Sequence, residues 1–513
     1  MTIIDALRKP AAPSMDTAPA PNMLCDFLRR HARQKPDETA FICGARTISW
    51  RALDETSANL ARWFLDQGLT PGDRVTICSL NSIELVQVYL GLLKAGLIAV
   101  PINMRLKPDE IRFILGHADP KMAFCEPAFV PLLEQAGATF PLVTHLPDLA
   151  SARADQPDLP DIGPDCLCLI VYTSGTTARP KGVTHCQGAL CQKGLKGVRI
   201  IRHVPDPVCL VFLPMMHTSG IWSLAMSICD GYPVVLLPRF DPAAALDAID
   251  RSGCTSFGAL PTMALAMLEE QTARPRQLAT LRSAISGGDG VPPALQKRFK
   301  QVFGVELLEA YAMTEMCAIA ANIPGACREG SVGLPLEGIE VRVVDLDGRD
   351  VPVGETGEIT VRGSSLCIGY WKDPEATRAA MVGGWLHTGD LGAIDSDGFI
   401  WFRGRKKEVI IRAGSNISPQ EVEEALYKHP AVLEVGVVGV PDPVTIERVA
   451  AFVVLRQGQN VSADELCAFA RRHIADYKAP EEIHFRNELP KNAVGKVQRR
   501  ALKEMLAAAA PVQ

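Results

Sequence analysis

The feature that most restricts the fold of this chain is an alternation of two hydrophobic periods. Segments with helical spacing of apolar residues, such as 53–67 and 83–95, alternate with short runs rich in Val and Ile, such as 74–78 and 99–102. Helices that alternate with buried strands are typical of α/β folds with largely parallel sheets. The pattern continues to about residues 283–286, so the sequence predicts a large N-terminal domain built from α/β subdomains.

Two changes of pattern indicate further units. From about residue 338, short strands with Asp-Gly and Gly-rich turns over 340–345, 357–361 and 399–403 predict a small antiparallel or barrel-like β region. Beyond it, strands and helices predict a small mobile α+β domain, and the polar stretch 403–408 before it suits a hinge. We therefore expect a disordered tail over 1–22, a large domain over 23–404 and a small C-terminal domain over 405–513.

Composition and charge argue against several classes of function. The 53 basic and 58 acidic side chains give a formal net charge of -5, so no diffuse basic field indicates nucleic acid as a partner. We find no signal peptide and no apolar stretch long enough to span a membrane. The fifteen cysteines include no Cys-x-x-Cys pair, which suits reduced thiols. We therefore expect a cytoplasmic protein.

A loop rich in hydroxyl groups follows the apolar run 166–171. It reads YTSGTTARPKG over 172–182, and its hydroxyl groups, flexible backbone and lysine supply the donors and the charge that a polyphosphate needs. The spacing is not that of a Walker A loop, because Lys181 follows Gly175 by six residues and precedes another glycine. The nucleotide ligands predicted here are Thr173, Ser174, Gly175, Thr176, Thr177 and Lys181.

This loop resembles the signature loop of the adenylate-forming superfamily, which includes acyl-CoA synthetases, luciferases and peptide-synthetase adenylation domains. Further segments similar to the superfamily's motifs follow in the same order. They are PMMHTSG over 214–220, EAYAMTE over 309–315, TGD over 388–390 and PKNAVGK over 490–496. The resemblance covers residues 24 to 503.

The resemblance implies roles for the segment 309–315. In the superfamily the aromatic residue stacks on adenine, the threonine contacts phosphate and the glutamate helps to hold Mg²⁺, and these positions fall on Tyr311, Thr314 and Glu315. A hard carboxylate oxygen is the ligand that Mg²⁺ prefers. The same resemblance adds Gly288, Glu309 and Ala310 to the nucleotide ligands and Thr177 to the metal site.

The last two motifs imply a ribose clamp and a catalytic cation. Asp390 matches the carboxylate that accepts hydrogen bonds from the ribose hydroxyls, and Arg405 completes the clamp. Lys496 matches the lysine that bridges the carboxylate and phosphate oxygens during adenylation. Lys496 lies far beyond Arg405 in the chain, so it reaches the nucleotide only if the small domain folds over the large one.

In the superfamily the C-terminal domain rotates after adenylation and opens a tunnel for a thiol. The hinge position corresponds to Lys407, and the tunnel strip corresponds to Ala413 and Gly414. Many relatives carry two glycines in this strip, whereas this chain has Ala413 in place of one of them.

The segment 214–220 resembles the mouth of the acid pocket, where His217 would lie near the substrate carboxylate and serve with Lys496, Thr314 and Glu315 as a catalytic residue. Amino-acid-activating relatives carry an aspartate here, and none lies between residues 214 and 227. A buried ammonium group without a counter-charge is costly, so we disfavour an α-amino acid. The expected pocket residues, which suit an aliphatic chain or an aromatic ring, are His217, Thr218, Gly220, Trp222, Gly287, Met313 and Cys317.

The resemblance thus implies an acyl-CoA synthetase that takes a fatty or aromatic acid, ATP and CoA to acyl-CoA, AMP and pyrophosphate, with Mg²⁺ as cofactor. One alternative is an acyl-AMP ligase that loads a separate carrier protein. Another is a non-catalytic nucleotide-binding regulator. A homodimer and a lysine acetyltransferase that acts on Lys496 are further hypotheses about partners.

Overall fold

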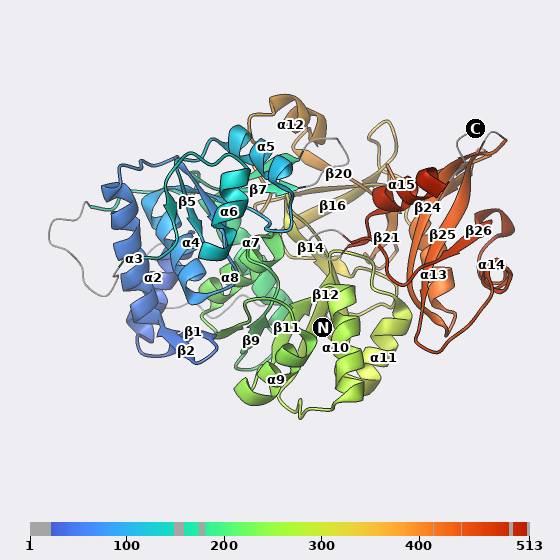
Figure 1. Ribbon diagram of the computed structural model, residues 1–513, viewed down its shortest axis with the longest axis horizontal. Helices are drawn as coiled ribbons and strands as arrows, with labels where there is room; N and C mark the ends of the chain where they lie inside the picture. The colour runs from blue at the N-terminus through green and yellow to red at the C-terminus, as the bar shows by residue number, and fades with distance from the viewer. Residues whose placement is uncertain are drawn as a thin grey trace.

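The computed structural model describes residues 22–147, 158–173, 180–413, 415–442, 444–491 and 496–509. Its architecture is mixed α/β, with a large N-terminal body and a smaller C-terminal α+β lobe drawn in orange and red in Figure 1. This confirms the fold class. The predicted tail over 1–22 lies outside the described residues except for its last position.

Two largely parallel sheets form the large body. The first has seven strands in the order β18-β8-β7-β4-β3-β5-β6, of which β7 pairs antiparallel with β8 and β8 with β18. Its strands are β3 (Arg74–Cys78), β4 (Ile98–Pro101), β5 (Met122–Cys125), β6 (Leu142–Val143), β7 (Leu167–Thr173), β8 (Lys181–Cys186) and β18 (Gly369–Tyr370).

The second sheet has nine strands in the order β15-β14-β13-β12-β11-β9-β10-β1-β2. They are β1 (Thr39–Cys43), β2 (Arg46–Ser49), β9 (Cys209–Val211), β10 (Val234–Leu236), β11 (Ser256–Ala259), β12 (Ser283–Gly287), β13 (Leu307–Met313), β14 (Cys317–Ala321) and β15 (Leu334–Pro335). The strands β9 to β13 are mutually parallel, and β13 turns back into the antiparallel β14.

Helices pack against these sheets and bury the largest core. The predicted helix over 83–95 matches α4. Its two ends are fixed by local caps, because the Ser82 side chain accepts a hydrogen bond from Leu85 N–H and Gly96 ends the helix in a left-handed conformation. The helices of the large body are α2 (Leu24–Gln34), α3 (Trp50–Asp66), α4 (Ile83–Ala95), α5 (Pro108–Ala118), α6 (Val130–Gln135), α7 (Gln187–Ile201), α8 (Thr218–Asp230), α9 (Pro242–Ser252), α10 (Pro261–Ala273), α11 (Pro293–Phe303) and α12 (Pro374–Ala380).

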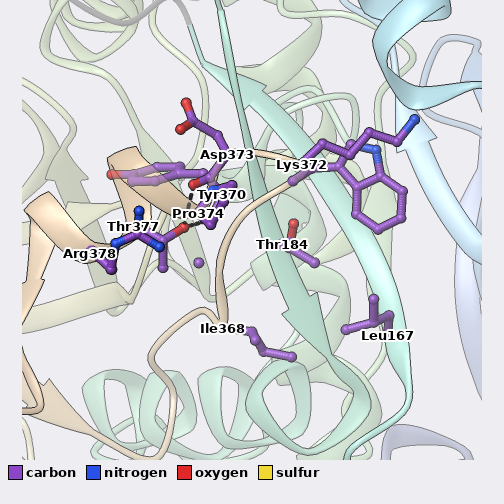
Figure 2. Close-up of a pocket in the computed structure, with 11 residues that line it drawn as sticks. Leu167, Thr184, Ile368, Tyr370, Lys372, Asp373, Pro374, Thr377 and Arg378 are labelled. Atoms are coloured by element: carbon purple, nitrogen blue, oxygen red, sulfur yellow. Dashed lines mark hydrogen bonds between the residues drawn. The ribbon is translucent and has the colours of Figure 1, made fainter.

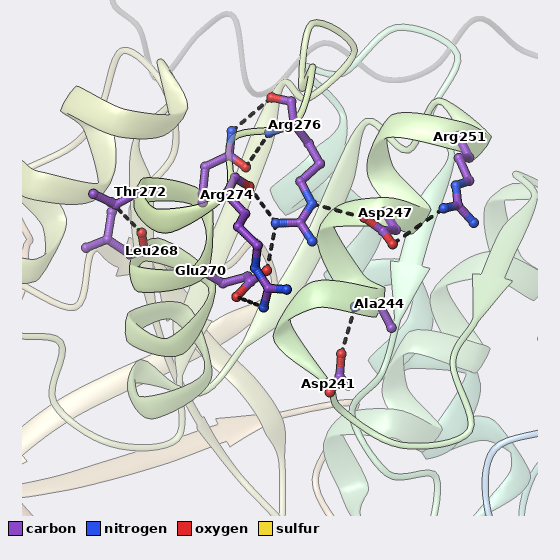
Figure 3. A network of polar contacts seen from close by, with 10 residues as sticks. Asp241, Ala244, Asp247, Arg251, Leu268, Glu270, Thr272, Arg274 and Arg276 are labelled. Carbon is purple, nitrogen blue, oxygen red and sulfur yellow. Dashed lines mark hydrogen bonds and ion pairs between the residues drawn. The ribbon is translucent and has the colours of Figure 1, made fainter.

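An ionic network joins α9 and α10 at one end of the second sheet (Figure 3). The Arg276 guanidinium group contacts Asp247 of α9 at 3.0 Å and Glu270 of α10 at 2.7 Å. Arg274 also contacts Glu270, at 2.9 Å. These contacts are distant in sequence from the predicted site motifs, so we assign them to the scaffold.

A third sheet is antiparallel, in agreement with the turn pattern. It contains β16 (Ile339–Val344), β17 (Gly357–Gly363), β19 (Met381–Val382), β20 (Trp385–Ile394) and β21 (Ile400–Arg405). One prediction was wrong in its bounds. The polar stretch 403–408 is not all linker, because residues 403–405 are the end of β21, with 404 and 405 paired to β20, and only 406–408 form a turn.

The small lobe is built around a sheet of strands β23-β22-β25-β24, with β26 beside β25. Its elements are β22 (Ile410–Arg412), β23 (Ser415–Ile417), α13 (Pro419–Tyr427), β24 (Val432–Asp442), β25 (Ile446–Leu455), α14 (Ala463–Arg471), β26 (Glu482–Phe485) and α15 (Arg499–Ala509). Among the described residues, no helix is both long and apolar enough to cross a membrane.

Candidate active site

The predicted phosphate loop joins the antiparallel strands β7 and β8. Thr173 and Lys181 are partners in the β7–β8 register, so they flank the two ends of the loop. Residues 174–179 lie outside the described part of the chain, and with them the predicted ligands Ser174, Gly175, Thr176 and Thr177. The Lys181 ammonium group lies 4.8 Å from the centre of the Tyr370 ring.

The predicted metal residue Glu315 lies in the short turn between β13 and β14, beside Thr314. Its Oε1 accepts a hydrogen bond of 3.0 Å from the Tyr370 hydroxyl. Tyr370 therefore contacts both the lysine of the phosphate loop and the glutamate of the turn. Our sequence reasoning missed this residue, because β18 carries it 55 positions beyond Glu315 and no motif that we considered includes it.

Tyr370 also borders a surface pocket of about 480 Å³, together with Thr184, Lys372 and Thr377 (Figure 2). None of the residues predicted for the acid pocket lines this cavity. The cavity is therefore distinct from the predicted acid pocket.

The predicted ribose clamp is assembled from β13, β20 and β21. The Tyr311 hydroxyl donates a hydrogen bond of 2.6 Å to Asp390 Oδ2, and Arg405 Nε lies 3.3 Å from Asp390 Oδ1. Asp390 is 4% exposed, and its burial raises the pKa of the carboxyl group while Arg405 and Tyr311 act against that rise. The carboxylate is thus oriented by two partners from different strands.

The turn that carries Asp390 depends on local hydrogen bonds. Thr388 Oγ1 donates to Ile359 O at 2.6 Å and accepts from Asp390 N–H at 3.1 Å. Gly389 has a φ of 72°, a left-handed conformation that glycine adopts without steric cost. This geometry explains why a Thr-Gly-Asp sequence occurs here.

The glycine-rich turn after β12 approaches β13 closely. A Cβ atom at Gly287 would lie 2.4 Å from Ala310 O, so a larger residue does not fit. Glu309 accepts hydrogen bonds from Val291 N–H at 3.2 Å and Gln296 Nε2 at 3.4 Å. Burial raises the pKa of Glu309 to about 8. The Glu309 carboxyl group thus holds the loop that follows Gly288.

Lys496 reaches this site from the small lobe. A Cβ atom at Gly288 would lie 3.9 Å from Lys496 Nζ. Burial lowers the pKa of Lys496, Asp289 and Asp390 act against this, and Arg405 adds to it. The small lobe is therefore folded over the large body. Residues 492–495 lie outside the described part of the chain.

His217 is the N-cap residue of α8. Its Nδ1 accepts from Ser219 N–H at 3.4 Å and lies 3.1 Å from Ser219 Oγ. Burial, with a contribution from the Lys496 charge, lowers the pKa of His217 to about 4. The ring is neutral at pH 7, and we assign its proton to Nε2 because Nδ1 accepts.

The other residues predicted for the acid pocket come from four elements. Thr218, Gly220 and Trp222 lie on α8, Gly287 ends β12, and Met313 pairs with Cys317 across the β13–β14 turn. A Cβ atom at Gly220 would lie 2.4 Å from Pro214 O, so the glycine allows α8 to begin close to the preceding loop.

The predicted hinge residue Lys407 lies in the turn 406–408, between residues that are held by opposite bodies. Lys406 Nζ contacts Glu358 of β17 at 3.2 Å, and Lys406 N–H donates to Gly389 O at 2.9 Å. Glu408 accepts from Arg499 Nη1 of α15 at 2.8 Å. In the predicted tunnel strip, Ala413 has a φ of 47°, and Gly414 is outside the described residues.

The donor set suits a metal that is held mainly by a nucleotide. Within the described residues, no group of three or more His, Cys, Asp or Glu side chains could hold a metal ion. Mg²⁺ usually retains several waters and binds one or two carboxylates together with substrate phosphates. Glu315 fits that mode of binding, because Tyr370 contacts both its carboxylate and Lys181 at the end of the phosphate loop.

The fold and the order of the motifs are those of adenylate-forming enzymes. Residues 28–371 match the AMP-binding enzyme family, and residues 421–496 match the AMP-binding enzyme C-terminal domain. The chain therefore belongs to the AMP-binding enzyme family, as the resemblance predicted.

Individual relatives extend over nearly the whole chain. Sulfoacetate–CoA ligase of Cupriavidus necator is 36% identical over 93% of this chain and 96% of its own length. Fatty acid–[acyl-carrier-protein] ligase ScoC of Streptomyces coeruleorubidus is 33% identical over 92% and 94%. The structure of o-succinylbenzoate coenzyme A synthetase from Bacillus subtilis with ATP and magnesium ion has a TM-score of 0.84 and 30% identity over 93% of this chain and 99% of its own.

Proposed function

We propose that this AMP-forming acid–thiol ligase activates a carboxylic acid with ATP and passes the acyl group to CoA at the site formed around Asp390 and Lys496. The observation that carries the proposal is the meeting of Lys496 from the small lobe with the Gly288 turn and the Tyr311–Asp390–Arg405 clamp. A CoA ligase among the relatives supports the same reaction class.

Adenylation brings a carboxylate against the α-phosphate, and two like charges about 4 Å apart repel by roughly 4 kcal/mol at an effective dielectric of about 20. Lys496 is the residue that offsets this repulsion, because its ammonium group lies beside the Gly288 turn and interacts electrostatically with Asp390. We assign the ribose hydroxyls to Asp390, the adenine face to Tyr311 and the phosphates to Thr314 and Lys181. Mg²⁺, when bound near Glu315, neutralises phosphate charge.

His217 is proposed to orient the acid. Because Nδ1 accepts from Ser219, the Nε2–H group is the donor that remains for a substrate carboxylate. A neutral ring donates a hydrogen bond without binding the carboxylate as a full ion pair, so the carboxylate remains available to attack phosphorus.

The thiol step is proposed to follow rotation about Lys407. The side chains of Lys406 and Glu408 are held by the large body and by α15 respectively, which restricts the change in dihedral angles to the residue between them. Val444 is 87% exposed and Ile446 61% exposed, beside the strip that contains Ala413. We propose that this apolar face docks on the large domain, residues 23–404, when Lys496 withdraws.

The acid is proposed to be fatty or aromatic rather than an α-amino acid, because no aspartate accompanies His217 in its motif. A second candidate acceptor is a carrier protein, since one relative is a fatty acid–[acyl-carrier-protein] ligase. We favour free CoA because a relative that spans nearly the whole chain is a CoA ligase. We further propose a cytoplasmic location and a homodimer, which measurement of the mass in solution would test.

Acetylation of Lys496 by a lysine acetyltransferase is also proposed, because it would remove the charge that adenylation needs. Normal pyrophosphate release by homogeneously acetylated protein would contradict this mode of regulation.

The function is tested by pyrophosphate release with fatty, aryl, dicarboxylic and amino acids, each with and without CoA. We expect one acid class to give sustained turnover only with CoA. Turnover that requires an added acyl carrier protein instead would favour the second acceptor, and no release with any acid would refute the ligase assignment.

A further inference from the structure

The helix α7 buries a lysine beneath the turn that carries Thr314 and Glu315. Lys193 is 2% exposed, and its ammonium group lies 3.3 Å from Thr314 O and 3.5 Å from Glu315 O. A lysine is rarely buried without partners, so these carbonyl groups account for its position. Burial lowers the pKa of Lys193, while Glu315 is among the groups that act against this change.

The turn held by Lys193 is short and strained. Met313 and Cys317 are paired across it, and Cys317 opens β14 with a φ of 71°, which is unfavourable for a residue other than glycine. Glu315 O also accepts a hydrogen bond of 2.7 Å from Cys367 N–H, and the Glu315 carboxylate accepts from Tyr370. Glu315 is thus held at its backbone by α7 and by the loop before β18, and at its side chain by β18.

The positive charge beneath the turn is carried by Lys193 and not by the neighbouring His185. His185 of β8 is fully buried, and burial together with the Lys193 charge lowers the pKa of its ring well below the ordinary value, so it is neutral at pH 7. The backbone of Lys193 is itself fixed, because Lys193 O accepts a hydrogen bond of 2.8 Å from Trp222 Nε1.

We propose that Lys193 is a positioning residue for the reaction. Its buried ammonium group fixes the backbone of Thr314 and Glu315 so that their side chains are placed for the polyphosphate and its Mg²⁺. This inference rests on the proposed function, in which Thr314 and Glu315 meet the phosphates and the metal. Lys193 itself is not assigned a contact with the substrate.

The chain offers a matched control on the same helix. Lys196 is 7% exposed, its pKa is lowered by burial, and its ammonium group donates to Glu337 O at 3.0 Å. Lys193→Met and Lys196→Met both remove a buried ammonium group that binds a backbone carbonyl. Of these two lysines, Lys193 contacts the turn of Thr314 and Glu315 and Lys196 contacts Glu337 instead. A general loss of stability is therefore expected in both variants, and an effect on the metal-nucleotide site is expected in Lys193→Met alone.

Calorimetric titration of the full chain with Mg²⁺ and the non-hydrolysable α,β-methylene ATP tests the inference, with AMP as the second ligand. We expect Lys193→Met to raise the Kd for the Mg²⁺ complex about tenfold and to leave the Kd for AMP within twofold, because AMP carries no polyphosphate. Lys196→Met should change neither Kd by more than twofold. An unchanged Kd for the Mg²⁺ complex in Lys193→Met, or equal increases for both ligands, would overturn the inference.

If Lys193→Met does not give folded protein, Lys193→Gln replaces it, because its amide is polar but lacks the charge and the reach of lysine. We expect at least a threefold rise in the same Kd, and a wild-type value would overturn the inference. Wild-type protein that binds neither ligand would instead contradict the proposed function.

Discussion

Removal of the Lys496 charge should impair one half-reaction selectively. The variant is Lys496→Ala, and the magnitude follows from the position of the ammonium group. The group lies beside the Gly288 turn, where the carboxylate and α-phosphate are proposed to meet, and it interacts electrostatically with Asp390. The repulsion that it offsets is roughly 4 kcal/mol for like charges about 4 Å apart at an effective dielectric of about 20. We therefore expect adenylation to slow by about three decades.

The two half-reactions are measured separately. Adenylation is followed as ATP–pyrophosphate exchange, and the thiol step is followed by supplying synthetic acyl-adenylate and CoA. Lys491→Ala is the matched control, because Lys491 lies in the same motif but its ammonium group contacts Glu434 at 2.6 Å within the small lobe. Lys491→Ala should adenylate at the wild-type rate.

The reasoning is refuted by either of two results for Lys496→Ala. An adenylation rate within tenfold of wild type would mean that the charge does not offset the repulsion. An equal loss in both half-reactions would mean that Lys496 stays in the site during the thiol step, against the proposed rotation.

Three further variants probe the hinge, the strained strip and a buried acid. Lys407→Pro, which fixes φ, should slow the thiol step more than adenylation, and equal rates for the thiol step in variant and wild type would contradict the hinge. Ala413→Gly should stabilise the protein by about 1 kcal/mol in urea unfolding, because Ala413 has a φ of 47°, and no gain would show that the strain is compensated locally. Glu309→Gln addresses pH. The pKa of Glu309 is raised from an ordinary 4.5 to about 8, so the folded protein retains a proton that the unfolded chain releases, and this contribution to stability is lost as pH rises from 4.5 to 8. The variant should lose less stability than wild type over that range, and parallel unfolding curves at pH 5 and pH 8 would argue against a buried neutral carboxyl group.

Elements bounded by local signals were predicted closely from the sequence. The strand over 74–78 and the helix over 83–95 have the expected bounds, because apolar runs, a serine cap and a terminal glycine act within a few residues. The end of β21 was predicted wrongly, because Arg405 extends the strand through pairing with Asp390 of β20. No signal within 399–408 specifies that partner.

The residues of the candidate site also divide into those that a local sequence pattern predicts and those that depend on contacts between distant segments. The motif residues Asp390 and Lys496 could be proposed from the sequence, since each lies in a recognisable local pattern. Tyr370 could not, because its role depends on a contact with Glu315 that only the pairing of β18 with β8 creates. Lys193 was also missed, because a lysine on a helix is normally solvated and nothing in its neighbourhood predicts burial.

These residues suggest why the site tolerates motion of a whole lobe. Glu315 is fixed by Lys193, Cys367 and Tyr370, all of which belong to the large body. Lys496 comes from the other side of the turn 406–408. Withdrawal of the small lobe therefore removes the adenylating cation and leaves the three contacts to Glu315 intact. The protein would then change from acid activation to thiol transfer without dismantling the turn of Glu315, since the three contacts described for this turn do not cross the hinge.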